Sequence, residues 1–293
     1  MSQSKNTVVV AADGGGTGCR AAAGTLGAGI LGQAARGPGN VHSDFKGAIA
    51  NLTDAIDAAL VQAGHADTPL AEVTAHLGVA GAHSEVEMAA VADALPYGSV
   101  TVSGDRATSV RGALGEVDGY VVALGTGTIL ARQRALEMTT VSGWGFELSD
   151  QASGAWLGHQ VLRAATMAED GMTPHTDLTR RVLEVHGGLI ETIHFTSVAS
   201  PGDYAPLARH VITQAKNGDP VGRDLMAQGA AFLARGLRTL GFVKGDLLVL
   251  AGGVGPHYAD YLPEDLTKKI AAPKGTALDG AFAMAIQALK VHG

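Results

Sequence analysis

A glycine-rich turn occurs twice in this chain, each time at the end of an apolar stretch. Thr7–Ala12 runs into the DGGGTG segment of residues 13–18, and Tyr120–Leu124 runs into the GTGT segment of residues 125–128. After each turn the chain resumes as a second apolar stretch. An ordinary turn does not need so many positions without side chains beside hydroxyl groups, and backbone N–H groups exposed at glycines can bind phosphate oxygens. The sequence therefore predicts two strand–turn–strand units that together clamp a phosphate.

Elsewhere the chain alternates between strand-like and helix-like segments. Apolar spacing predicts helices over Asp44–Gly64 and Asp105–Leu114 and strands over Thr74–Val79 and Ser99–Ser103. Strands that alternate with helices indicate an α/β fold with a mainly parallel sheet. Further helices are expected at Ser153–Ala168, Thr176–His186, Pro206–Lys216 and Pro220–Gly241.

The second half of the chain repeats the plan of the first. The strand endings LGVAG at 77–81 and LVLAGG at 248–253 match, and a length of 293 residues is enough for two domains. The last predicted helix, Ala277–Val291, is expected to cross back to the first domain. We therefore expect two duplicated domains facing each other across a cleft, one formed by residues 1–112 plus 281–293 and the other by residues 113–280.

Composition excludes several classes of protein. The formal net charge is −7 and the Lys and Arg residues form no dense block, which argues against nucleic-acid binding. No apolar run approaches the ~20 residues of a membrane helix. A single cysteine, Cys19, excludes a disulfide framework and any multi-cysteine metal site. We expect a cytoplasmic protein.

Asp13 lies at the end of the first strand, directly before the glycines. A carboxylate beside a phosphate loop repels the phosphates unless a divalent cation lies between them, and Mg²⁺ suits a site with few protein carboxylates. Gly15, Gly16 and Thr17 could then donate backbone and hydroxyl hydrogen bonds to phosphate oxygens. The alternative is a plain hairpin turn that favours aspartate. The chain has no G-x-x-x-x-G-K-[ST] motif, and Cys19 breaks a G-x-G-x-x-G pattern.

Asp105 follows the strand that ends near Ser103 and opens a predicted helix. Its carboxylate could act as the base that accepts a proton from a substrate hydroxyl in phosphoryl transfer. The alternative is an N-cap aspartate, a role that this position also suits.

Residues 142–154 combine many hydrogen-bonding groups with two aromatic residues. Asp150 can accept from two neighbouring hydroxyls of a sugar, and Gly143 and Gly145 leave backbone groups open to a ligand. Ser153 belongs to the same candidate sugar site, although Asp150 or Ser153 could instead cap the next helix. For Trp144 we favour a place in the core over a ligand contact.

Two glycine-rich segments near the end of the chain could hold a nucleotide base. Gly252 and Gly253 follow a strand and could form a flat surface for a purine, and Gly218, before a helix, could close the other side. A simple helix start is the alternative for Gly218. His42, His83 and His257 have no ligand spacing and are interpreted as solvated or structural.

Taken in order, these segments resemble the sugar-kinase branch of the actin–hexokinase–Hsp70 superfamily, specifically the N-acetylglucosamine and glucosamine kinases. The matching pieces span nearly the whole chain: DGGGT at 13–17, GN at 39–40, VSGD at 102–105, LGTGT at 124–128, GWG at 143–145, Asp150, LAGGV at 250–254 and ALDGA at 277–281. The resemblance implies two ribonuclease-H-like, actin-like ATPase domains with a nucleotide and sugar cleft between them, and it suggests a homodimer.

The resemblance also implies roles for individual residues. Asp105 would be the catalytic base, and sugar contacts would come from Asn40, Gly143–Gly145 and Asp150. ATP contacts would come from Thr17, Thr126 with Gly127, Gly218 and the Gly252-Gly253 turn. The family stretch that usually reads GDEGS reads SDQAS at 149–153 here, a difference that bears on which sugar is bound more than on the reaction.

The hypothesis is an ATP- and Mg²⁺-dependent kinase that phosphorylates the 6-hydroxyl of glucosamine or N-acetylglucosamine. One alternative is a kinase for another small sugar, such as an anhydro- or N-acylmuramic sugar. The other is a nucleotide-operated clamp without kinase activity, as other members of the superfamily are. The related activase ATPases need cysteines for an iron–sulfur cluster, which Cys19 alone cannot supply.

Overall fold

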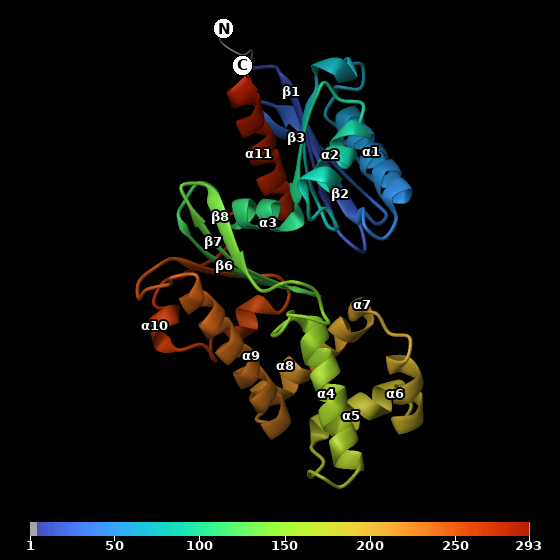
Figure 1. Ribbon diagram of the computed structural model, residues 1–293, viewed down its shortest axis with the longest axis vertical. Coiled ribbons are helices and arrows are strands. Elements are labelled where there is room, and N and C mark those ends of the chain that lie inside the picture. The colour runs from blue at the N-terminus through green and yellow to red at the C-terminus, as the bar shows by residue number, and fades with distance from the viewer. Residues whose placement is uncertain (1–4, 293) are drawn as a thin grey trace. The chain divides into compact units, whose positions relative to one another are not determined.

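The structure, a computed structural model, describes residues 5–292. The chain divides into two compact units: unit 1 comprises Met1–Val117 with Pro273–Gly293, and unit 2 comprises Asp118–Ala272. Each unit contains one five-stranded sheet packed against helices (Figure 1), so the expected α/β fold class is confirmed. Within residues 5–292, no helix is both long and apolar enough to cross a membrane.

The sheet of unit 1 has the strand order β3-β2-β1-β4-β5. β1, β2 and β3 are antiparallel neighbours, whereas β1, β4 and β5 run parallel, with Gly14 opposite Val79 and Val79 opposite Gly104. The carboxyl ends of these three parallel strands therefore lie at one edge of the sheet. The strands are β1 Val8–Gly14, β2 Cys19–Thr25, β3 Gly29–Arg36, β4 Thr74–Val79 and β5 Ser99–Gly104.

Helices from distant parts of the sequence cover the two faces of this sheet. Alternate residues of a strand point to opposite faces. Val10 belongs to the apolar core formed with α1, whereas Val9 and Ala11 pack with Phe282 of α11. α1 and α11 accordingly lie on opposite sides of the strands (Figure 1). The helices of unit 1 are α1 Phe45–Gln62, α2 Glu85–Asp93, α3 Asp105–Leu114 and α11 Ala277–His292.

α3 and α11 cross at a pair of glycines. A Cβ atom added to Gly112 would lie 1.9 Å from the carbonyl oxygen of Thr276, and one added to Gly280 would lie 2.0 Å from that of Thr108. Glycine is needed at both positions because any side chain would separate the two backbones. All of α11 belongs to unit 1. The boundary between the units therefore lies before this helix, at Pro273, and not at residue 281 within it.

The sheet of unit 2 has the strand order β10-β9-β6-β7-β8. No strand is expected at β8 from the sequence. It pairs with β7 through a two-residue turn in which Ala135 and Leu136 both have positive φ, 50° and 67°. The amide of Ala135 donates to Asp118 Oδ1 at 2.8 Å, which helps to hold this turn. The strands are β6 Gly119–Leu124, β7 Thr128–Arg134, β8 Glu137–Val141, β9 Leu248–Ala251 and β10 Ile270–Ala271.

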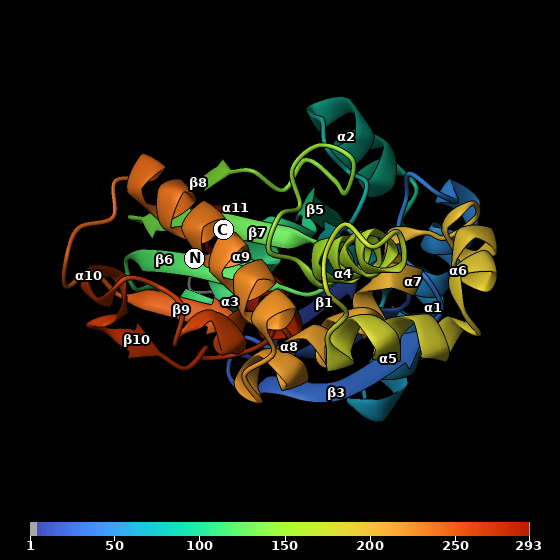
Figure 2. The ribbon, with the colours of Figure 1, turned by 90° about the horizontal axis from the view of Figure 1, so that it is seen from below.

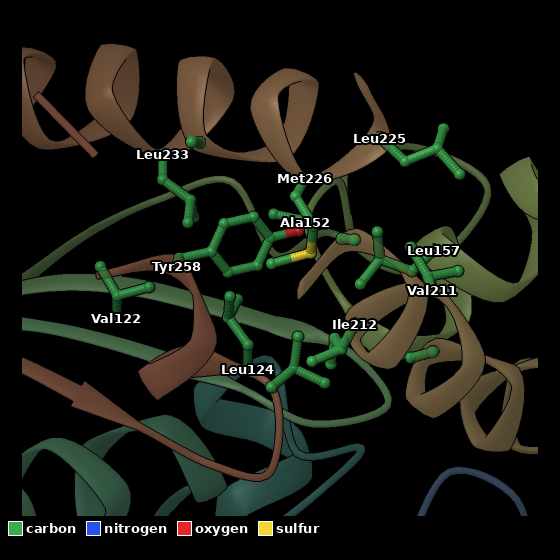
Figure 3. Packing of buried hydrophobic residues seen from close by; sticks show 14 of the residues in the cluster. Val122, Leu124, Ala152, Leu157, Val211, Ile212, Leu225, Met226, Leu233 and Tyr258 are labelled. Carbon is green, nitrogen blue, oxygen red and sulfur yellow. The ribbon is translucent and has the colours of Figure 1, made fainter. Parts of the chain in front are cut away.

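Helices pack on this sheet through a large apolar core. α9 crosses the strands (Figure 2), and a Cβ atom added to its Gly236 would lie 2.2 Å from Leu130 of β7. Figure 3 shows the ring of Tyr258, which has no exposed surface, between Leu233 and Met226 of α9 and the side chains of Val122 and Leu124. The helices are α4 Gly154–Glu169, α5 Asp177–His186, α6 Leu189–Thr196, α7 Pro201–Tyr204, α8 Ala208–Lys216, α9 Pro220–Thr239 and α10 Glu264–Thr267.

The helices expected from apolar spacing are present, with small shifts at their ends. α1 shows why the spacing works. Asp44 caps its N-terminus by accepting from the amide of Gly47 at 3.0 Å, and Gly64, with φ of +77°, follows its C-terminus. Aspartate before the first turn and glycine after the last are the ordinary signals of helix ends.

Candidate active site

The first glycine turn joins β1 to β2 as a hairpin, as expected. Gly14 pairs with Cys19, and the amide of Gly15 donates to the carbonyl of Gly18 at 2.9 Å across the turn. Gly16 and Thr17, at the tip, are exposed. The backbone N–H groups and the hydroxyl of the tip are thus accessible to a ligand.

Three loops of unit 1 meet at the carboxyl ends of its parallel strands. The amide of Gly39 donates to Gly15 O at 2.9 Å, that of Ala80 to Gly14 O at 2.7 Å, and that of Val41 to Ala80 O at 3.0 Å. A Cβ atom on Gly14 would lie 2.8 Å from Gly39 O, so glycine permits this close approach. These bonds fix the glycine turn against the loops that follow β3 and β4.

Asn40 lies in this group of loops. Its Oδ1 accepts from the amide of His42 at 2.9 Å and from that of Ser43 at 3.2 Å. Gly81, with φ of +88°, lies beside it, and a Cβ there would come within 2.5 Å of Asn40 Oδ1. The half-buried side chain of Asn40 is therefore held in one orientation by a turn of its own making.

Asp105 is the first residue of α3, and Gly104 is the N-cap. The interpretation of Asp105 as an N-cap is thus wrong, because its backbone is already helical. Burial raises the pKa of the Asp105 carboxyl, the neighbouring Arg106 lowers it, and the charge of Asp13 raises it. The two carboxylates are therefore close enough for the charge of Asp13 to influence the protonation of Asp105.

Asp13 lies near the end of β1 with a side chain only 14% exposed. Its Oδ2 accepts from the guanidinium of Arg20, on the neighbouring strand β2, at 2.6 Å. Among residues 5–292, no cluster of three or more His, Cys, Asp or Glu side chains could hold a metal. That finding is compatible with Mg²⁺, which keeps several waters and takes one or two carboxylates.

The second glycine turn joins β6 to β7, again as expected. Leu124 pairs with Thr128, and the amide of Gly125 donates to Gly127 O at 3.1 Å. The start of α4 is fixed beneath this turn, because the amide of Gly154 donates to Gly125 O at 2.8 Å. Gly125 and Thr126 remain exposed at the tip.

The segment before α4 places Asp150 beside this turn. A Cβ atom on Gly127 would lie 2.9 Å from Asp150 Oδ2. Ser153 is fully buried, and its Oγ accepts from the amide of Trp156 at 3.0 Å as the N-cap of α4. The capping alternative for Ser153 is confirmed, and the hydroxyl has no exposed surface through which it could contact a sugar.

The loop that precedes Asp150 is held by left-handed backbone. Gly143 and Gly145 have φ of 72° and 100°, and Ser149 Oγ accepts from the amide of Trp144 at 2.8 Å. The Trp144 side chain is 67% exposed. The interpretation of Trp144 as a core residue is therefore wrong: the flanking glycines turn the indole outward, and Phe146 packs on the core instead.

A cavity of about 510 Å³ opens in unit 2 beside the second glycine turn. Gly253 lines it. Gly252, with φ of +76°, packs closely on β6, where a Cβ would lie 2.3 Å from Leu124 O. Gly218 lines a neighbouring hollow with Asp219. The cavity is lined by Gly125, Gly154, Ala205, Ala208, Arg209, Ile212, Thr213, Lys216, Asn217, Gly253, Val254 and His257.

Asp219 links the segment after Gly218 to two helices. This buried carboxylate caps α9 by accepting from the amide of Gly222 at 3.0 Å, and it also accepts from Leu178 in α5 at 3.2 Å. The alternative of a helix start at this position is therefore confirmed.

Two cavity residues were not anticipated. Lys216 Nζ lies 3.3 Å from Nδ1 of His257 at the edge of the cavity. Burial and the charge of Lys216 lower the pKa of His257. A histidine without ligand spacing gives no sequence signal of this kind, because α8 and the turn after β9 become neighbours only in the fold.

The chain is similar to proteins of known family. The sequence profile of the BadF/BadG/BcrA/BcrD ATPase family matches residues 11–277. The glucosamine kinase GspK of Vibrio cholerae is 30% identical over 279 residues, which cover 94% of this chain and 95% of that protein. A protein of Clostridium acetobutylicum named N-acetylmuramic acid/N-acetylglucosamine kinase is 27% identical over 276 residues, 89% of each chain.

A solved structure shows the same fold. The crystal structure of a candidate N-acetylglucosamine kinase from Chromobacterium violaceum superposes with a TM-score of 0.88 at 28% identity, covering 97% of this chain and 100% of that one. The expected fold class, that of the actin-like ATPases and sugar kinases, is confirmed.

Proposed function

Because the chain belongs to the BadF/BadG/BcrA/BcrD ATPase family, we propose that it is an ATP-dependent amino-sugar kinase that phosphorylates the 6-hydroxyl of glucosamine or N-acetylglucosamine. The observation that carries the proposal is the placement of Asp105, a carboxyl with raised pKa at the start of α3, near Asp13 and the first glycine turn. The names of the relatives support an amino sugar as the acceptor.

The proposal assigns the nucleotide to the glycine turns and the cavity of unit 2. Gly15, Gly16 and Thr17 in one turn and Thr126 and Gly127 in the other would donate to phosphate oxygens. The apolar and glycine surfaces of the 510 Å³ cavity, including Gly253, suit an aromatic base. Gly252 and Gly218 would contribute through the backbone conformation that they allow next to this cavity.

Asp13 is the residue proposed to hold Mg²⁺, mainly through water. Its carboxylate is partly accessible and adjoins the glycine turn, as a site shared with phosphates requires. The ion would neutralise charge on the phosphates. Arg20, which donates to Asp13 Oδ2, would orient the Asp13 carboxylate.

Asp105 would accept the proton of the sugar 6-hydroxyl as the hydroxyl oxygen bonds to the γ-phosphorus of ATP and the bond from that phosphorus to the leaving ADP breaks. Its pKa, raised mainly by burial, makes it a stronger base than an ordinary aspartate. Asn40, whose Oδ1 is engaged in its turn, would contact the sugar through Nδ2. Asp150 and the backbone of Gly143–Gly145, with Trp144 exposed beside them, complete the proposed sugar contacts.

The specific sugar is the open choice within this class. An N-acylmuramic sugar carries a lactyl carboxylate, which requires a cation in the pocket, and residues 143–154 contain none. Because the relative from Clostridium is named for N-acetylmuramic acid as well, this sugar is included among the substrates to be tested. A homodimer, the absence of nucleic-acid binding and a cytoplasmic location stay predictions from the sequence.

A coupled assay of ADP release tests the proposal. The panel contains glucosamine, N-acetylglucosamine, glucose, N-acetylmuramic acid and anhydro-N-acetylmuramic acid, each with ATP and Mg²⁺ and with a no-sugar control. We expect ADP release to depend on an amino sugar and the product to carry phosphate at the 6-position. ADP release that no sugar changes favours the nucleotide-operated clamp and contradicts the kinase.

A further inference from the structure

A chain of hydrogen bonds runs through the sheet of unit 1 to the base of α3. His76, on β4, is 4% exposed. Its Nδ1 lies 2.8 Å from Oγ1 of Thr101, and its Nε2 lies 3.1 Å from Oγ of Ser103, both on β5. The Ser103 hydroxyl in turn donates to the carbonyl oxygen of Gly104 at 3.2 Å.

The direction of these bonds follows from chemistry. Burial lowers the pKa of His76 to about 4, so its imidazole is neutral at neutral pH, with one donor and one acceptor nitrogen. The Ser103 hydroxyl uses its proton on Gly104, so it must accept from Nε2–H. The Thr101 hydroxyl has two possible acceptors, Nδ1 at 2.8 Å and the carbonyl oxygen of Ala75 at 3.3 Å, and the shorter contact assigns its proton to Nδ1. The four groups therefore form one directed relay that ends on a backbone carbonyl.

That carbonyl belongs to the peptide group between Gly104 and Asp105. The peptide group on the other side of Asp105 is also held, because the Thr108 hydroxyl donates to Asp105 O at 3.0 Å. Thr108 is fully buried and fits into the space left by Gly78, where a Cβ would lie 2.3 Å from it. Hydroxyl groups thus hold both peptide planes that set the direction of the Asp105 side chain.

We propose that His76, acting through Ser103, is a positioning residue that orients Asp105 toward the acceptor hydroxyl. The inference rests on the proposed function, in which Asp105 is the base. His76 itself touches no substrate and transfers no proton. Its contribution is the fixed orientation of a catalytic group, and a misplacement of about 1 Å can cost on the order of 10²-fold in rate.

The test compares Ser103→Ala, His76→Leu and His76→Gln with Thr74→Val. Thr74 is a buried hydroxyl two residues before His76 on the same strand and is not part of the relay. We expect Ser103→Ala and His76→Leu to lower kcat at least ~10-fold with KM for ATP unchanged. His76→Gln, whose amide can still donate to Ser103, should recover part of kcat, and Thr74→Val should keep it.

A double-mutant cycle separates positioning from a purely structural role. If Ser103 acts through Asp105, adding Ser103→Ala to Asp105→Asn should leave the residual rate unchanged. A further fall equal to that of the single variant overturns the inference, as does wild-type kcat for Ser103→Ala in a protein with a normal melting curve. If His76→Leu fails to fold, the kcat values of Ser103→Ala and His76→Gln still test the inference.

The two proposals fail in different ways. Near-normal turnover of Asp105→Asn removes the base and contradicts the proposed mechanism itself. An inactive Asp105→Asn together with unchanged Ser103→Ala and His76→Gln leaves the kinase intact and rejects only the positioning role.

Discussion

Among single residues, Asp105 is the proposed base: it is the first residue of α3, its carboxyl is partly buried, and the charge of Asp13 acts on it. Replacing it by Asn should lower kcat by about 10²–10⁴, because the acceptor hydroxyl loses its base while ATP still binds. Steady-state kinetics and nucleotide titration measure the two effects separately. Asp93→Asn, an exposed acid on α2 of the same unit, is the matched control and should leave both unchanged.

The raised pKa of Asp105 predicts an acid limb in the rate profile. The base works only when ionised, so kcat should fall as pH falls through its pKa, and burial places that midpoint above the value of an ordinary aspartate. A profile of kcat against pH at saturating substrates checks this expectation. An acid limb centred at or below the ordinary aspartate value would speak against Asp105 as the group that titrates.

His76 predicts a pH dependence of stability. The unfolded chain takes up a proton on His76 near pH 6.5, whereas the folded protein does so only near 4. Between these values the unfolded state binds more protons, so the free energy of unfolding falls as pH is lowered, by roughly 3 kcal/mol for this group alone. Urea unfolding at pH 7 and pH 4.5 measures the loss. His76→Gln should show a smaller dependence, and an equal one would exclude His76 as its source.

At the scale of elements, the crossing of α3 and α11 depends on Gly112 and Gly280. A methyl group at Gly280 would lie 2.0 Å from a backbone oxygen, so the helices must move apart. We expect Gly280→Ala to destabilise the protein by about 1–3 kcal/mol or more, the range of overpacked sites, with a matching fall in Tm. Gly202→Ala is the control, since Gly202 is exposed in α7 and a Cβ there would have its nearest neighbour at 3.6 Å. Equal melting temperatures for both variants would contradict this account.

Elements with strong local signals are predictable from sequence. β4 and α3 lie where apolar spacing and glycine punctuation place them. β8 is not predictable from the sequence. Its hairpin turn places Ala135 and Leu136 at positive φ, where Asn or Gly usually occurs, so the turn lacks the residues by which it is normally recognised. Asp118 stabilises that turn from a distant position, and local patterns do not report such a contact.

Some features of the candidate site are likewise predictable from the sequence, and others are not. Asp105 and the two glycine turns are predictable because strand ends and glycine patterns are local. The outward position of Trp144 and the role of Ser153 as a buried cap depend on how the loop folds back on Ser149. Lys216 and His257 are 41 residues apart and meet only through tertiary structure.

At the scale of the whole molecule, the proposal assigns the two ligands to different segments. A non-hydrolysable ATP analogue should slow hydrogen exchange in α8 and in residues 252–257, which contribute Gly253, Val254 and His257 to the lining of the cavity of unit 2. The amino sugar alone should slow exchange at residues 39–43 and 103–106 of unit 1. α6 serves as the internal control. Protection by the nucleotide outside α8, residues 252–257 and the glycine turns would contradict the assignment.

The position of α11 has a consequence for how the protein is made. This helix is the last element of the chain, yet it covers the face of the first sheet that carries Val9, Ala11 and Ala22. A ribosome therefore completes all the strands before that apolar surface gains its cover. Nascent chains expose it throughout translation, and products released early lack the helix altogether, so chaperones and proteases should recognise them preferentially.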